Sequence, residues 1–207
     1  MIIAIDGPAA AGKGTLAKRL AAELGLPYLD TGLLYRATAR RVLDGGAAAS
    51  DAKAALVAAG SLTQADFERS DLRDAETSKA ASDVASIPAV RAALLDFQRN
   101  FGAQHGAVLD GRDIGTIIFP QADVKLFVTA SVEARAKRRW LEFAARGEAV
   151  ALEDVIADVA ARDEADRTRA SAPLVQADDA TLIDTTHLNA DEAFEVALHC
   201  VRGKTAG

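Results

Sequence analysis

The segment that most constrains this chain is residues 7–15, Gly-Pro-Ala-Ala-Ala-Gly-Lys-Gly-Thr. It follows an apolar run at residues 2–5 and precedes leucines at helical spacing, at positions 16, 20 and 24. Strand, glycine-rich loop and helix in this order are typical of a phosphate-binding loop, because glycines let backbone N–H groups approach a polyphosphate from one side. A plain glycine-rich turn is the alternative, but it explains neither the spacing nor the flanking elements. The segment therefore predicts a nucleoside triphosphate site.

Three glycines shape this loop, and two side chains give it chemistry. Gly7, Gly12 and Gly14 admit the close backbone approach. Lys13 is expected to reach the β- and γ-phosphates, and a hydroxyl near the helix start is expected to meet magnesium. Because Gly14 follows the lysine, that hydroxyl comes one place later than in the commonest phosphate loop, at Thr15. The expected donor-site residues are Gly7, Pro8, Ala9, Ala10, Ala11, Gly12, Lys13, Gly14 and Thr15.

Charge and composition exclude several functions. The 207 residues are enough for one domain with a full parallel sheet. The net charge of −6 argues against a general nucleic-acid or membrane-surface binder. Of 24 basic residues 17 are arginines, which suit bidentate phosphate contacts. Cys200 is the single cysteine, no apolar run is long enough to span a membrane, and the first strand leaves no room for a signal peptide. We expect a cytoplasmic protein.

Five short apolar runs predict the strands of the sheet. Helical patterns separate them, which indicates βαβ units and a parallel sheet with helices on both faces. The expected fold is therefore an α/β core with a five-stranded parallel sheet and a phosphate loop. The predicted strands are residues 2–5, 26–29, 107–109, 124–128 and 181–183.

Two helical stretches are too long to be plain crossovers. Residues 32–104 have a helical pattern throughout, so we interpret them as an insertion that carries the second substrate site. A second stretch, residues 131–169, is interrupted at residues 146–148, where Gly147 could serve as a hinge. The helices predicted within the first stretch are residues 33–43, 51–59, 75–85 and 90–101.

Four further segments complete a recognisable pattern. They are Leu-Asp-Thr-Gly-Leu-Leu-Tyr-Arg at residues 29–36, Ser-Ile-Pro-Ala-Val-Arg at 86–91, Asp-Gly-Arg-Asp-Ile-Gly-Thr at 110–116 and Arg-Asp-Glu-Ala-Asp-Arg at 162–167. With the phosphate loop, and in this order from residue 2 to about residue 185, they resemble the bacterial cytidylate kinases.

The resemblance implies an activity and a division of the chain. The activity is transfer of the γ-phosphoryl group of ATP to CMP or dCMP, with Mg²⁺ at Thr15 directly or through water. The division is a core of residues 1–31, 105–142 and 170–207, a monophosphate-binding domain of residues 32–104 and a lid of residues 143–169. Between about residues 47 and 74 the chain is shorter than many family members, which leaves the closure of the monophosphate-binding domain open.

The turn after the second strand has two interpretations. The hydroxyl of Thr31 could cap a helix that begins at Leu33. Alternatively, Thr31 and the exposed amides of that helix could bind an anion, with Arg36 one turn further on. The resemblance favours the second interpretation, with the acceptor phosphate of CMP as the anion.

The segment after the third strand carries the predicted base recognition. Asp110 lies at the ligand-binding edge of the sheet, either for magnesium-bound water or for a hydrogen bond to the following loop. Arg112 and Asp113 could form a surface ion pair worth about 0–1 kcal/mol. The resemblance instead implies Arg112 on the CMP phosphate, and Asp113 with Arg91 and Ser82 on cytosine. A carboxylate accepts from the N4 amino group of cytosine, and uracil has a carbonyl there.

The second helical stretch ends in charged residues on one face. Arg162, Asp166 and Arg169 lie at i, i+4 and i+7, and a solvated Arg–Asp pair is the plain interpretation. The resemblance implies that Arg162 reaches phosphate and sugar and that Asp166 reaches the sugar hydroxyls. It makes Arg135, Arg139 and Arg169 lid-side candidates near the ATP phosphates.

Taken together, the predicted catalytic residues are Lys13, Arg112 and Arg162, and Arg139 joins the ATP site. No general base is expected, because a phosphate acceptor is already an anion. Kinases of UMP, AMP or a small acid or alcohol remain alternatives, as does an inactive scaffold. A GTP-binding switch is excluded, because the chain lacks Asp-x-x-Gly and Asn-Lys-x-Asp motifs. We expect a monomer whose CMP site comprises Thr31, Arg36, Ser82, Arg91, Asp110, Arg112, Asp113, Arg162 and Asp166.

Overall fold

The computed structural model describes residues 1–205 and contains one five-stranded parallel sheet in the described chain. The strand order is β2-β3-β1-β4-β5, so β1 lies in the centre between β3 and β4. The predicted fold class is therefore confirmed. The strands are β1 (Ile2–Asp6), β2 (Tyr28–Asp30), β3 (Ala107–Gly111), β4 (Val124–Thr129) and β5 (Thr181–Asp184).

The second strand begins later than the sequence predicted. Residues 26–29 were expected, but the backbone N–H of Leu26 still bonds to the carbonyl of Ala21 at 2.9 Å, across the left-handed Gly25. The chain is therefore still closing the preceding helix, and pairing with β3 begins only at Tyr28. The strand continues to Asp30, which brings that carboxylate to the ligand edge of the sheet.

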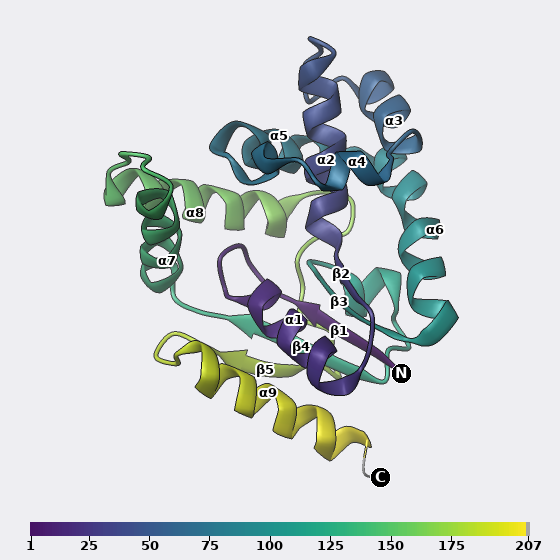
Figure 1. Cartoon of the computed structure of the whole chain (residues 1–207), viewed down its shortest axis with the longest axis vertical. Helices are drawn as coiled ribbons and strands as arrows, with labels where there is room; N and C mark the ends of the chain where they lie inside the picture. The colour runs from purple at the N-terminus through teal and green to yellow at the C-terminus, as the bar shows by residue number, and fades with distance from the viewer. Residues whose placement is uncertain (206–207) are drawn as a thin grey trace.

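Helices cover both faces of the sheet (Figure 1). On one face, α1 (Lys13–Leu24) and α9 (Ala190–Thr205) pack on buried side chains of β1 and β4. On the other, α6 (Pro88–His105) and a short π-helix, Ile114–Ile118, pack near Ala4 and Leu109. Burial on both faces is what parallel sheets require, because their crossovers carry the chain over both sides.

The first insertion is a helical body above the sheet (Figure 1). It has a hydrophobic core of its own, which includes Leu34, Val42, Val84 and Leu94. The four predicted helices are confirmed: α2 and α6 extend beyond the predicted ends, α3 is shifted by one residue and α5 has the predicted bounds. Two short elements were not predicted. The helices are α2 (Thr31–Asp44), α3 (Ala52–Gly60), α4 (Gln64–Phe67), a 3₁₀ turn (Ser70–Arg73), α5 (Ala75–Ala85) and α6.

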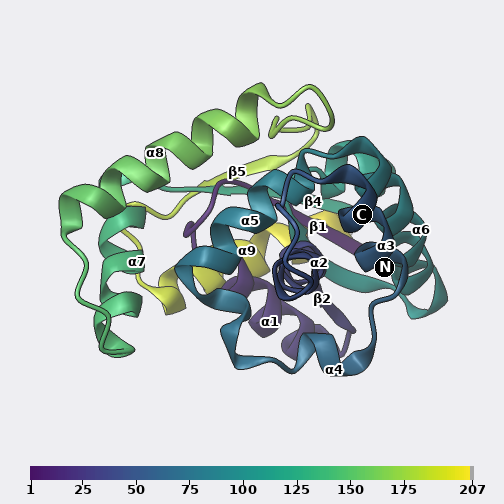
Figure 2. The same ribbon diagram turned by 90° about the horizontal axis from the view of Figure 1, so that it is seen from above.

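The second insertion is a helical hairpin at one end of the sheet (Figures 1 and 2). It consists of α7 (Val132–Ala145) and α8 (Leu152–Thr168), which pack through a separate apolar cluster around Phe143 and Val155. The chain breaks between them where predicted, and Gly147 there has a left-handed φ of 78°. Within the described residues, no helix has the length and apolarity needed to cross a lipid bilayer.

Candidate active site

The phosphate loop leaves β1 and enters α1 at the ligand edge of the sheet. Gly7 has a φ of 145°, and a Cβ there would lie 1.9 Å from the carbonyl oxygen of Val128, so only glycine fits. Gly12 has a left-handed φ of 86°, and no side chain caps the helix that follows. The first N–H groups of α1 are therefore open to an anion. Gly7 and Pro8 turn the chain but do not line the cavity, whereas residues 9–15 do.

Lys13 is buried beside this loop without a carboxylate of its own. Its Nζ donates to the carbonyl of Pro8 at 2.7 Å. Burial, with the nearby positive charge of Arg112, lowers the pKa of Lys13 to about 7. A bound polyphosphate would supply a negatively charged partner for this lysine, which has none in the described chain without a ligand.

The carboxyl end of β3 places Asp110 opposite the phosphate loop. Its carboxylate accepts a hydrogen bond from the hydroxyl of Tyr28 at 2.8 Å. Burial, with the nearby Asp30, raises the pKa of Asp110 to about 6. Of the two interpretations of Asp110, the hydrogen bond to the following loop is wrong, because the donor to its carboxylate is Tyr28 of β2. The backbone carbonyl of Asp110 accepts from the hydroxyl of Thr31 at 2.8 Å.

Asp30 is the centre of an ion-pair cluster at the end of β2. It caps α2 by accepting from the N–H of Leu33 at 3.1 Å, so the alternative interpretation of Thr31 as the cap is wrong. Asp30 can accept from the N–H of Leu33 because Asp30, and not Thr31, is the N-cap residue directly before the first helical residue. It also accepts from Arg36 at 2.7 Å and from Arg73 at 3.0 Å. Both guanidinium groups line the cavity.

Two further arginines line the same cavity, Arg112 directly after β3 and Arg162 on α8. Arg112 donates from Nε to Asp166 at 2.7 Å. Arg162 has no carboxylate within ion-pair distance among residues 1–205, and its Nε is buried without a hydrogen-bond partner. Burial, with the charge of Arg112, lowers the pKa of Arg162 to about 10. The plain interpretation of a solvated Arg162–Asp166 pair is therefore wrong, because Arg112 takes the carboxylate from across the cavity.

The opposite wall of the cavity holds Asp113 between arginines. Its carboxylate accepts from Arg91, and Arg169 lies with Nη2 3.7 Å from the other oxygen. The guanidinium of Arg91 lies 5.5 Å from the ring centre of Tyr35, and Ser82 lies on the same lining. The alternative of a surface pair between Arg112 and Asp113 is wrong, since Arg112 pairs with Asp166 and Asp113 pairs with Arg91. The structure places Arg169 beside Asp113, in the lining of the same cavity.

The lid-side arginines differ in their placement. Arg139 lines the cavity and donates to the hydroxyl of Ser78 at 3.3 Å, which links α7 to α5. Arg135 does not line it, because its guanidinium is occupied by Asp163 and by the carbonyls of Ala9 and Ala130. Arg135 therefore ties α8 to the phosphate loop.

Apart from Gly7, Pro8 and Arg135, the predicted site residues surround one cavity of about 270 Å³. Nine basic and five acidic side chains line it, although the chain as a whole carries a net charge of −6. Three guanidinium nitrogens there are buried without a hydrogen-bond partner: Nε of Arg36, Nε of Arg162 and Nη2 of Arg169. Each of these buried donors is costly to leave without an acceptor, so the cavity favours an anionic ligand that would supply one.

Sequence reasoning missed several residues that line this cavity. Ser78, Ala81 and Ala85 share the helical face of Ser82 on α5, so their spacing could have identified them. Arg73 gave no such signal, because it lies on a 3₁₀ turn without periodicity and meets Asp30 only in the folded chain. The other missed residues with polar side chains are Lys18, Asp30, Tyr35 and Glu142.

The fold and the cavity together define a P-loop phosphotransferase with two helical insertions. Solved structures show the same fold: an uncharacterized protein from Eubacterium ventriosum has a TM-score of 0.56 at 13% identity, covering 97% of this chain and 98% of that one. A Thermus thermophilus protein has a TM-score of 0.50 at 24% identity, covering 100% and 98%.

Sequence comparisons identify the family. The family model for cytidylate kinase matches residues 3–203. The curated cytidylate kinase of Acidiphilium cryptum is 64% identical, over 97% of this chain and 95% of the relative. Those of Methylocella silvestris and Granulibacter bethesdensis are 61% and 59% identical, over 96% and 99% of this chain and 92% and 98% of the relatives. The chain therefore belongs to the cytidylate kinase family, ATP-dependent kinases of CMP and dCMP, and the alternative of a UMP kinase finds no support.

Proposed function

We propose that this protein transfers the γ-phosphoryl group of ATP to CMP and dCMP in the cavity between the phosphate loop and Asp113. The observation that carries the proposal is the division of that cavity. On one side Lys13 and Arg162 are buried with no carboxylate within ion-pair distance in the described chain, and on the opposite wall Arg91 holds the carboxylate of Asp113. Phosphates would bind the first group and the cytosine base the second.

The cations act on the transferred group. In phosphoryl transfer the protein positions donor and acceptor in line and stabilises charge on the equatorial oxygens. Lys13 and Arg162 would take that role, because neither has a carboxylate within ion-pair distance in the described chain. Arg112 would join them on the CMP phosphate when the ligand competes with Asp166, while Arg36, Arg73 and Thr31 hold the acceptor end.

The residues present fit a magnesium ion that arrives with the nucleotide. Mg²⁺ favours oxygen ligands and is held in kinases by phosphates, waters and few protein groups. Thr15 lies exposed on the first turn of α1 and lines the cavity, and the Asp110 carboxylate faces the same space. When bound, Mg²⁺ would neutralise phosphate charge and orient the phosphates. Among residues 1–205, no three His, Cys, Asp or Glu side chains group as a metal site.

The base is read by Asp113 in this proposal. Its carboxylate would accept from the N4 amino group of cytosine, and Arg91 would serve the N3 and O2 acceptors. Arg169 also lies beside Asp113, and both side chains are part of this buried wall. Uracil would set its O4 carbonyl against that carboxylate, and both oxygens would then lack protons.

The two insertions would close over the bound nucleotides. We propose residues 32–104 as the monophosphate-binding domain and residues 143–169 as the lid, with the remaining residues as the core. The separate apolar cluster around Leu34 and Val84 supports the first domain, and the cluster around Phe143 and Val155 joins the lid to the end of α7. Arg146 of the lid donates to the carbonyl of Arg73 at 3.0 Å, and Arg139, just before the lid, donates to the hydroxyl of Ser78 at 3.3 Å. We also propose that the protein works as a monomer in the cytoplasm, a compartment that suits its single free cysteine.

An acceptor panel tests the proposed activity. The protein is mixed with MgATP and, separately, with CMP, dCMP, UMP and AMP, and ADP formation is followed by a coupled assay. Turnover with CMP and dCMP well above that with UMP and AMP is expected. Equal turnover of CMP and UMP would contradict the assigned base recognition.

Hydrogen exchange with and without a cytidine–adenosine bisubstrate analogue tests the proposed closure. Closure predicts that the analogue increases protection in both insertions as well as at residues 7–15.

A further inference from the structure

A carboxylate from another strand holds the amino end of the π-helix Ile114–Ile118. Asp6, the last residue of β1, accepts the N–H of Ile114 through Oδ1 at 2.8 Å and the N–H of Gly115 through Oδ2 at 2.7 Å. The side chain is buried, with 5% of the residue exposed. Both carboxylate oxygens therefore accept hydrogen bonds from the backbone of this helix.

This arrangement is needed because the helix does not cap itself. Asp113 is the residue at its N-cap position, where an aspartate side chain normally accepts from the first free N–H groups. The Asp113 side chain makes no such bond, because it faces Arg91 and Arg169 in the cavity. Asp6 satisfies the amides in its place, and the Asp113 carboxylate stays available to a ligand.

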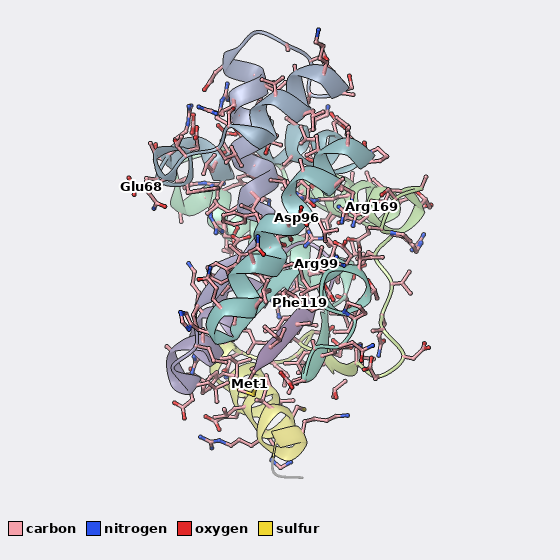
Figure 3. All side chains as sticks on the ribbon, turned by 90° about the vertical axis from the view of Figure 1, so that its right-hand side faces the viewer. Met1, Glu68, Asp96, Arg99, Phe119 and Arg169 are labelled. Atoms are coloured by element: carbon pink, nitrogen blue, oxygen red, sulfur yellow. The ribbon has the colours of Figure 1, made fainter. Side chains whose placement is uncertain are left out.

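The rest of the segment is also fixed. Arg99 of α6, seen in Figure 3, donates to the carbonyls of Ile117 and Ile118 at 3.1 and 3.2 Å. At Gly115 a Cβ would lie 3.1 Å from Cδ of Lys125 and 3.3 Å from Oδ2 of Asp6. The loop that carries Asp113 is therefore held at both ends, with little space at its amino end.

We infer that Asp6 is a positioning residue for base selection: it holds the loop so that Asp113 faces the base. Because Gly7 follows Asp6 directly, the same residue also fixes the base-reading loop relative to the phosphate loop. The inference rests on the proposed role of Asp113 in reading cytosine.

The test replaces Asp6 by asparagine, which keeps the size but turns one acceptor oxygen into a donor that faces an N–H. Asp123→Asn is the matched control, because Asp123 accepts the N–H of Ile2 at 2.6 Å at the opposite end of β1. The readout is kcat/KM for CMP divided by kcat/KM for UMP. Asp6→Asn is expected to lower this ratio about fivefold, since small misplacement of a recognition group is costly. Asp123→Asn should leave it unchanged.

The double variant Asp6→Asn/Asp113→Asn separates positioning from general damage. If Asp6 acts through Asp113, the double variant keeps the same ratio as Asp113→Asn alone. Independent, multiplying effects of the two substitutions would overturn the inference, as would an unchanged ratio in Asp6→Asn when Asp113→Asn lowers it. An unchanged ratio in Asp113→Asn would instead remove the proposed base recognition itself, and the inference with it.

Gly115→Ala provides a second route if Asp6→Asn does not fold. It crowds the same junction from the loop side and leaves the Asp6 charge in place. A lowered CMP/UMP ratio that does not add to the effect of Asp113→Asn supports the inference. An unchanged ratio in the folded variant contradicts it.

Discussion

The phosphate side and the base side of the cavity differ in whether their charged side chains already have partners before a ligand binds. On the phosphate side, Lys13 and Arg162 are buried without a carboxylate partner, and burial lowers the pKa of both. On the base side, Asp113 already has Arg91 as a partner, and Arg169 is close by. The cations of the phosphate side, Lys13 and Arg162, therefore gain a counter-ion only when an anion binds. The carboxylate of the base side, Asp113, already has its arginine partner before any ligand binds.

This difference separates rate from selectivity. Lys13 and Arg162 are expected to stabilise the charge that develops on the phosphoryl group during transfer. Because that charge is the same for every acceptor, these two residues should affect the rate with all acceptors alike. A preassembled carboxylate contributes where acceptors differ, at the exocyclic group of the base. Substitutions on the two walls should therefore change different kinetic quantities.

The largest effect is expected for Lys13→Ala. The loop backbone still binds phosphate, but the charge on the transferred group loses a preorganised partner, which costs about 10²–10³ in kcat. Steady-state kinetics with saturating MgATP and CMP measures it, with circular dichroism to show that the variant folds. Activity within about threefold of the parent would contradict the role of Lys13.

Asp113→Asn should have the next largest effect, on the choice of base. It replaces one acceptor oxygen by a donor nitrogen of similar size, and a charged hydrogen bond is worth about 1.5–3 kcal/mol. The ratio of kcat/KM for CMP over UMP should fall by at least about tenfold, mostly through loss of CMP activity. If a folded variant keeps the ratio, base choice lies elsewhere, with Arg91 and Ser82 the next residues to test.

The smallest effect is a proton taken up when nucleotide binds. Because the pKa of Lys13 is about 7 in the free protein, the amine is mostly neutral at pH 8 and charged at pH 5.5. Bound phosphates raise this pKa, so ADP binding at pH 8 should take up at most about one proton, and affinity should fall as pH rises above 7. Calorimetry in buffers of different ionisation enthalpy measures the uptake. Lys13→Met should abolish it, and equal uptake in that variant would assign the proton to another group.

The fold could be predicted from the sequence where local patterns agree with the final contacts. The phosphate loop, the helices of the first insertion and the break at Gly147 all have such patterns. The start of β2 did not, because Gly25 and the returning N–H of Leu26 extend the helix end past the first apolar residue.

The site was harder to predict where partners come from distant segments. The cluster of Asp30 with Arg73, the pair of Arg112 with Asp166, and the bonds of Asp6 all join residues at least 43 positions apart. No periodicity encodes such pairs. Local alternatives such as a Thr31 cap or an Arg112–Asp113 pair look equally sound in the sequence, and tertiary contacts decide between them.

One experiment tests the separation of the two walls most directly: kcat/KM for CMP and for UMP in the parent, Lys13→Ala and Asp113→Asn proteins, measured side by side. We predict that Lys13→Ala lowers both values by the same factor, so that their ratio stays within about twofold, and that Asp113→Asn lowers the ratio by about tenfold or more. A changed ratio in Lys13→Ala, or an equal loss of both activities in Asp113→Asn, would contradict it.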